Sequence, residues 1–328
     1  MLLRFARSTQ PYVLVIVMLA VGVMWFTVPI RGDYCNVPAI SIYRWLYDLS
    51  KSTGLLIRLT GLVSLLLMAS LVIQLNTKYL FIGQRSYLPG ILFLLLSLLI
   101  HHSQNFHPVL WAGILLLFAI DRLLGTYRYD SLSYRVFDAA FFIGLSAVFY
   151  PPLFFLLLFC LLILPILRPF YWREWLLVLL GMALPFYFTF ALLYLLDKPE
   201  SSHFFLEYIN LLTFRCEGLK NTTTGSLVVF YYVIFILLLS VFSLLRNMGS
   251  IKILARKSYY LFFLLIIHLL LLYGLVPQVG REIFILMAIP VSYVIAFYFQ
   301  TGRHSRFKLI LFNLLVLTII LIRYVYPL

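Results

Sequence analysis

The chain is poor in charged residues, and poorest in acids. Only 11% of its 328 residues are charged, with 11 Asp and Glu against 25 Lys and Arg. Hydrophobic residues make up 64%, and the mean hydropathy is +1.04. So few charges cannot solvate the surface of a globule of this length, which excludes a soluble domain. The composition therefore predicts an integral membrane protein.

The chain also lacks the motifs of soluble enzymes. It has no Gly-rich phosphate loop, no metalloprotease helix motif, and three cysteines without paired metal-binding spacing. His101, His102 and His107 form the densest group of possible metal ligands. No Cys or carboxylate is near them in sequence, and His at a membrane boundary is often only an interfacial polar residue. We expect neither a metal ion nor a cofactor.

What the chain has instead is a series of long apolar runs. A run of about 20 residues crosses a hydrocarbon core of about 30 Å, and these runs predict a single all-α domain, residues 1–328, with about eleven transmembrane helices. The expected spans are Pro11–Ile30, Leu55–Leu75, Tyr87–Ile100, Pro108–Ile120, two helices that meet at Tyr150-Pro151-Pro152, Trp175–Leu196, Ser226–Leu245, Tyr259–Val276, Ile283–Gln300 and a last helix ending at Leu328.

The connecting segments alternate in charge. Basic segments, such as Arg4 to Arg7 and Arg246 to Lys257, alternate with segments that hold most of the acids. Because cytoplasmic loops carry the excess of Lys and Arg, the N-terminus is expected in the cytoplasm and the C-terminus on the outer side of the membrane. The net charge of +14 is then expected to face anionic lipid, not nucleic acid. The acids on the outer side are Asp33, Asp48, Asp197, Glu200, Glu207, Glu217 and Glu282.

Two outer loops are long enough to hold interfacial amphipathic helices. In the first, Pro38 can begin a helix whose polar residues, Ser41, Arg44, Asp48 and Lys51, recur every three or four positions. In the second, His203 to Phe214 is rich in aromatic residues. A membrane-resting linker and the wall of an active site both fit these helices.

Asp33 and Arg281 are the candidate site residues held nearest the membrane surface. Asp33 follows the first span almost directly, so it could act as a general base on an acceptor hydroxyl, or form an ion pair with Arg31 or Arg44. Arg281 lies in the short turn from Pro277 to Glu282, where its guanidinium could bind a lipid phosphate, although Glu282 beside it could neutralise it.

Two further features carry expectations. Cys35 and Cys216 both lie in outer loops, where a disulfide could join them, whereas Cys160 is expected to be a buried thiol. His268 lies alone inside an apolar run, where a polar residue normally faces a partner or a cavity.

Three stretches resemble an uncharacterised family of polytopic inner-membrane proteins from Bacteroidota. They are Asn76-Thr-Lys-Tyr-Leu-Phe-Ile-Gly-Gln-Arg-Ser-Tyr-Leu-Pro89, Phe137-Asp-Ala-Ala-Phe-Phe-Ile-Gly-Leu-Ser-Ala-Val-Phe-Tyr150 and Arg168-Pro-Phe-Tyr-Trp-Arg-Glu-Trp175. This resemblance extends over most of the chain and implies no particular reaction.

The order of elements also resembles the GT-C class of glycosyltransferases, which use polyprenyl-phosphate-linked sugars. Shared features are a short basic N-terminus, a span, an outer loop with an acid and an amphipathic helix, and then a bundle with short hairpins. The resemblance implies that Asp33 activates the acceptor and that Arg281, Arg44, Arg58 and Lys51 hold the lipid phosphate. Many members carry two neighbouring acids in that loop. Here the next acid is Asp48, so the metal-dependent variant is not expected.

Three functions remain open at this point. The first is a periplasmic-face glycosyltransferase of the GT-C type. The second is a non-catalytic membrane subunit of an envelope secretion or assembly complex, with protein partners. The third is a transporter, which is disfavoured because the spans carry few charges and show no inverted repeat.

Overall fold

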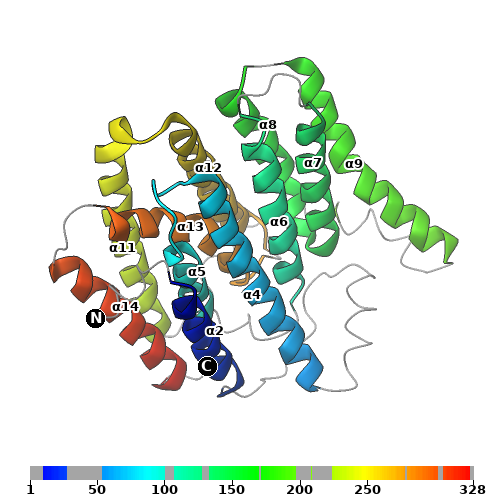
Figure 1. Ribbon diagram of the computed structural model, residues 1–328. Helices are drawn as coiled ribbons and strands as arrows, with labels where there is room; N and C mark the ends of the chain where they lie inside the picture. Colours follow the sequence, from blue (N-terminus) through cyan, green and yellow to red (C-terminus); the bar gives the residue numbers. More distant parts are fainter. Residues whose placement is uncertain are drawn as a thin grey trace.

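The protein is seen in a computed structural model that describes residues 10–27, 54–99, 107–127, 133–169, 171–196, 208, 224–277, 279–301 and 306–325. These residues form eleven α-helices and two short 3-10 helices, and no β-strand occurs among them (Figure 1). The predicted all-α helical bundle is thereby confirmed for this part of the chain.

Each expected span corresponds to one α-helix. The helices are α2 (Pro11–Thr27), α4 (Gly54–Tyr79), α5 (Leu88–Leu98), α6 (Pro108–Leu124), α7 (Ser133–Phe149), α8 (Leu156–Leu167), α9 (Trp172–Leu195), α11 (Thr224–Asn247), α12 (Ile253–Leu275), α13 (Ile283–Gln300) and α14 (Arg306–Val325). Several extend beyond the apolar run into basic residues. For example, α12 begins before Arg256 and Lys257, because Lys and Arg are good helix formers and hydropathy detects only the apolar part of a helix.

Five of the described helices, α4, α9, α11, α12 and α13, are long and apolar enough to cross a membrane. This identifies the chain as a membrane protein. Others are shorter. Helix α5 has 11 residues, which at 1.5 Å per residue span about 17 Å, roughly half of the hydrocarbon core.

The two prolines after Tyr150 act as predicted. Helix α7 ends at Phe149, Pro151 and Pro152 open the 3-10 helix η2 (Pro151–Phe155), and α8 follows directly. Proline has no N–H to continue the preceding helix but is compatible with a first helical turn. The chain therefore reverses within a few residues, and Tyr150 is buried in the turn.

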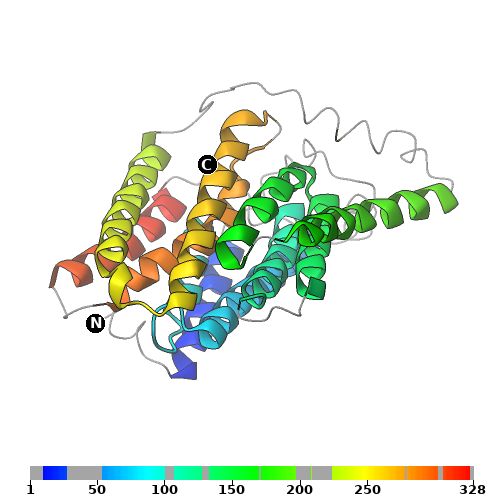
Figure 2. The same ribbon diagram turned by 90° about the horizontal axis from the view of Figure 1, so that it is seen from above.

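Helix α13 is the centre of the bundle. It packs against α5, α6, α11 and α12, and all of its residues from Ala288 to Phe299 are buried. The Tyr293 ring stacks on Phe262 of α12 with ring centroids 4.7 Å apart, and Phe81 packs edge-on against both rings. Figures 1 and 2 show α11 and α14 on one side of this centre and α6, α7, α8 and α9 on the other.

Helices α7 and α9 approach each other closely at two glycines. A Cβ at Gly144 of α7 would lie 2.6 Å from the carbonyl oxygen of Met182, and one at Gly181 of α9 would lie 2.7 Å from that of Phe137. Small residues allow such close backbone contact, which is a main source of helix association in membranes. The second half of α9 then extends away from the bundle (Figures 1 and 2), and Tyr187, Tyr194 and Leu195 are strongly exposed.

Candidate functional site at the Glu282 end of the bundle

The helix ends form two groups, one at each end of the bundle. At the first, here called the basic end, the Lys78 ammonium lies 2.6 Å from the Asp121 carboxylate, and Lys257 donates to the Leu167 carbonyl at 2.7 Å. The first contact joins the C-terminal ends of α4 and α6, and the second joins the end of α8 to the start of α12. The Lys257 ammonium also lies 5.0 Å from the centre of the Tyr127 ring, which follows α6. The described cations at this end are Lys78, Arg85, Arg122, Arg135, Arg168, Arg173, Arg246, Lys252, Arg256, Lys257, Arg306 and Lys308.

The three described acids at the basic end all form ion pairs. Besides the Lys78–Asp121 pair, Arg122 lies 3.7 Å from Asp138, and Arg168 lies 2.7 Å from Glu174. The last pair joins the end of α8 to the first turn of α9, and both side chains are 4% exposed. Since the cations at this end outnumber the acids, it keeps a positive charge.

At the opposite end, here called the Glu282 end, a buried carboxylate is held by groups from distant parts of the chain. The Tyr150 hydroxyl donates to Glu282 Oε1 at 3.0 Å across 132 positions of sequence, and the Gly280 backbone N–H donates to the same oxygen at 2.9 Å. Glu282 is 8% exposed and Tyr150 is fully buried. The His107 ring lies beside Tyr150, with centroids 6.4 Å apart.

The chemistry of this pair follows from burial. Tyr150 lies in the turn between α7 and η2, and burial, followed by the neighbouring Glu282 carboxylate, raises the pKa of its hydroxyl well above the ordinary value. The hydroxyl therefore keeps its proton and donates it to the carboxylate. Glu282 is thus bound by Tyr150 and by the backbone of its own turn, and this fixes the turn that carries Arg281.

The first outer loop begins and ends at the Glu282 end. Trp25 Nε1 of α2 donates to the Arg58 carbonyl of α4 at 3.1 Å, and Arg58 Nη1 donates to the Phe26 carbonyl at 3.4 Å. These bonds join the end of α2 to the start of α4, the two helices that flank residues 28–53. Arg58 therefore has a structural partner at the position where the sequence predicts a phosphate ligand.

The second outer loop emerges at the same end. Helix α9 runs from Glu174 at the basic end to Leu195, and α11 returns from Thr224. Within the intervening segment the structure describes Tyr208, whose hydroxyl donates to the Ala147 carbonyl of α7 at 3.2 Å and whose ring packs against Phe186. Tyr208 therefore lies against the end of α7, at a carbonyl three positions before Tyr150.

The structure describes only some of the predicted site residues. Arg58 and Arg281 are both described and both lie at the Glu282 end. The other predicted site residues, Asp33, Arg44, Lys51, Cys35 and Cys216, lie outside the described residues, as do both predicted interfacial helices apart from Tyr208. Cys160 is a buried free thiol, as predicted.

The histidines that the sequence singles out have structural partners where they are described. His268 Nε2 lies 2.7 Å from the Phe155 carbonyl, so the imidazole connects α12 to η2. His107 accepts from the Val109 N–H at 3.3 Å and so caps α6. Among the described residues, no three His, Cys, Asp or Glu side chains gather in a way that could hold a metal ion.

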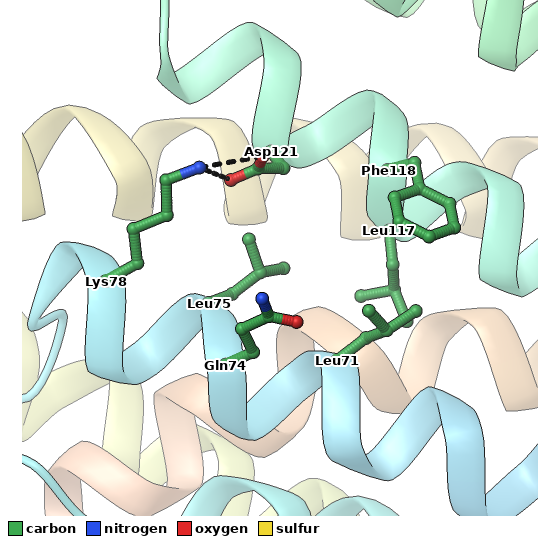
Figure 3. A pocket seen from close by; sticks show the side chains of 7 residues that line it. All are labelled: Leu71, Gln74, Leu75, Lys78, Leu117, Phe118 and Asp121. Carbon is green, nitrogen blue, oxygen red and sulfur yellow. Dashed lines mark hydrogen bonds and ion pairs between the residues drawn. The ribbon is translucent and has the colours of Figure 1, made fainter.

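A surface groove lies at the basic end between α4 and α6 (Figure 3). Its volume is about 70 Å³, far below the roughly 300–1,000 Å³ of a pocket that encloses a small molecule. Lys78 and Asp121 lie at one end of it, and Leu71, Leu117 and Phe118 at the other. Sequence reasoning missed this groove. The available signal was an acid, Asp121, at the end of an otherwise apolar run.

Comparison with protein-family models, with curated proteins and with solved structures gave no match.

Proposed function

We propose that the chain is a membrane glycosyltransferase-like protein of the GT-C type that takes a polyprenyl-phosphate-linked sugar at the Glu282 end of the bundle. In this proposal the basic end faces the cytoplasm of a bacterial cell, because its cations outnumber its acids. The Glu282 end then faces the periplasm. In this proposal the eleven helices belong to about eleven membrane segments, of which α5 forms only part of one, and the N-terminus lies in the cytoplasm.

The observation that carries this proposal is the convergence of three connecting segments at one end. Described residues of all three lie there: Trp25 and Arg58 on the helices that flank residues 28–53, Tyr208 within residues 197–223, and Glu282 with Tyr150 at the α12–α13 turn. A GT-C site needs an acid from the first loop and cations for the phosphate at the same membrane surface. Convergence makes that possible, and segments that emerged at opposite ends would exclude it.

The proposed roles follow from residue chemistry. Asp33 is the general base for the acceptor hydroxyl. Arg281 binds the lipid phosphate through its bidentate guanidinium, assisted by Arg44, Arg58 and Lys51. Glu282 is a positioning residue, since its carboxylate is bound by Tyr150 and Gly280 within the turn that carries Arg281.

A second candidate is a non-catalytic subunit of an envelope secretion or assembly complex. The feature that favours it is the projecting half of α9, where Tyr187, Phe188, Tyr194 and Leu195 are each at least 60% exposed. In a membrane these aromatic and aliphatic side chains can contact lipid or the helices of a partner protein.

Complementation in cells that lack the chain separates the two candidates. Lipid-linked sugars would be extracted and quantified by mass spectrometry after expression of the wild-type chain or of Asp33→Asn, Arg281→Ala or Arg281→Lys. The GT-C proposal expects the donor to accumulate with Asp33→Asn and Arg281→Ala at unchanged protein abundance. Arg281→Lys should retain partial turnover, because an ammonium keeps the charge but not the bidentate geometry.

Arg173→Ala is the matched control, since Arg173 is an exposed arginine at the basic end. It should leave the lipid-linked sugars at wild-type levels. If deletion of the chain leaves every lipid-linked sugar unchanged, or if Asp33→Asn complements fully, glycosyl transfer through Asp33 is wrong and the accessory function takes its place.

A further inference from the structure

The α4–α6 groove is charged at one end and mainly apolar along the rest, as a phospholipid is. At one end the Lys78 ammonium bonds both oxygens of Asp121, at 2.6 and 2.8 Å, and the rest of the groove is lined mainly by Leu71, Leu117 and Phe118 (Figure 3). The charge pair lies at the basic end of both helices, so it is placed at the level of lipid head groups. The apolar part runs from there toward the middle of the bilayer.

The apolar surface continues beyond the groove on both helices. On α4 the exposed side chains Leu67 and Val63 follow one and two turns further on, and on α6 the exposed Trp111 lies two turns before Phe118. From Lys78 to Val63 the rise along the helix is about 22 Å at 1.5 Å per residue. That distance suits an extended acyl chain that begins at Lys78.

We propose that this groove binds one anionic phospholipid, with its phosphate at Lys78 and one acyl chain along α4 and α6. This proposal is independent of the proposed catalytic function. The Lys78 side chain is 53% exposed, and an ammonium has three donors, of which Asp121 takes two. The third donor is available for a phosphate oxygen.

The charge of the lipid follows from the surroundings of the groove. Asp121 already accepts from Lys78 and from the Tyr79 hydroxyl at 2.9 Å, so it does not need a lipid amine as a partner. Every other described acid at the basic end is paired as well, with Arg122 or Arg168. Since the cations there exceed the acids, the potential favours a head group with a net negative charge over a zwitterionic one.

Binding of phosphatidylglycerol to the delipidated full chain in detergent tests the proposal, with native mass spectrometry as the readout. Lys78→Ala should weaken binding about fivefold, which corresponds to the contribution of one Lys near an anionic surface. Leu71→Trp should weaken it similarly, because the indole fills the groove and leaves the Lys78–Asp121 pair intact. Lys78→Arg keeps the charge and should bind as the wild type does.

Lys252→Ala is the matched control, since Lys252 is an exposed cation at the same end of the bundle and outside the groove. If this variant loses as much affinity as Lys78→Ala, the attraction is diffuse and the site is refuted. If phosphatidylethanolamine or phosphatidylcholine binds as tightly as phosphatidylglycerol, the head group is not anionic. If Lys78→Ala does not fold, Leu71→Trp decides the matter, and unchanged binding of that variant overturns the proposal.

Discussion

Removal of the Tyr150 hydroxyl tests how the Glu282 end is held together. Tyr150→Phe keeps the ring and its contacts but takes away the donor to Glu282 Oε1, leaving that buried oxygen with the Gly280 N–H. Tyr293→Phe is a matched control. Its hydroxyl is also fully buried and donates at 2.8 Å, but to the neutral Val72 carbonyl.

The two substitutions should differ in magnitude because the acceptors differ in charge. A hydrogen bond to a charged group contributes about 1.5–3 kcal/mol to stability, against about 0.5–1.5 kcal/mol for a neutral pair. Side-chain hydrogen bonds in membrane proteins average about 0.6 kcal/mol, which places the control toward the low end. We expect the free energy of unfolding to fall by about 2 kcal/mol in Tyr150→Phe and by about 1 kcal/mol or less in Tyr293→Phe.

The free energy of unfolding is measured by titrating dodecyl sulfate into mixed micelles, with circular dichroism as the readout. Both variants are measured, together with a double-mutant cycle that combines Tyr150→Phe with Glu282→Gln. The glutamine amide oxygen keeps an acceptor for Tyr150 but removes the charge. In the Glu282→Gln variant, Tyr150→Phe should lower the free energy of unfolding by no more than Tyr293→Phe does in the wild type. Equal costs for the two Tyr→Phe variants in the wild-type background would refute a charged hydrogen bond at Glu282.

Three further predictions concern the packing, the topology and the cysteines. Gly144→Ala should destabilise the bundle by about 1–3 kcal/mol, because the added methyl group collides with the α9 backbone. Gly274 has open space around it, so Gly274→Ala should be neutral or stabilising by up to about 1 kcal/mol. The same unfolding assay compares the two variants, and an equal change in stability would contradict the close α7–α9 contact. A reporter that works only in the cytoplasm should be inactive when fused after Leu328, and activity there would reverse the proposed topology. Cys35 and Cys216 should resist alkylation until a reductant is added, and alkylation of both without it would exclude their disulfide.

Much of the helical architecture is already present in the local sequence. The lipid core requires long apolar helices, so hydropathy alone located one helix for each run and placed α13 at Ile283–Gln300, as the structure has it. The prolines after Tyr150 marked a reversal because they cannot continue a helix. The alternation of basic and acidic segments predicted that the ends of α4 and α6 lie on one side and that the end of α8 and the start of α12 lie on that side too. The contacts of Lys78 and Lys257 bring these ends together in pairs, and the side of the membrane that they face stays a prediction.

The helix ends were less well predicted, for a local reason. The prediction for the second span ended at Leu75, but α4 continues to Tyr79 and brings Lys78 to Asp121. A hydropathy pattern stops at the first polar residues, whereas the backbone continues its hydrogen bonds until a residue leaves the helical conformation. At Leu80 the backbone has a φ of 53°, which ends α4.

The partners of the polar residues were decided by the tertiary structure alone. The sequence singled out Glu282 as a possible neutraliser of Arg281, but the donors that hold it are Gly280 and Tyr150, the latter 132 positions away. His268 was expected to face a partner or a cavity, and its partner is a backbone carbonyl of η2. Hydropathy and charge report the environment of each residue along the membrane normal. They contain no information about which helix lies beside which, because lateral packing depends on shape, as at Gly144 and Gly181, where two backbones meet.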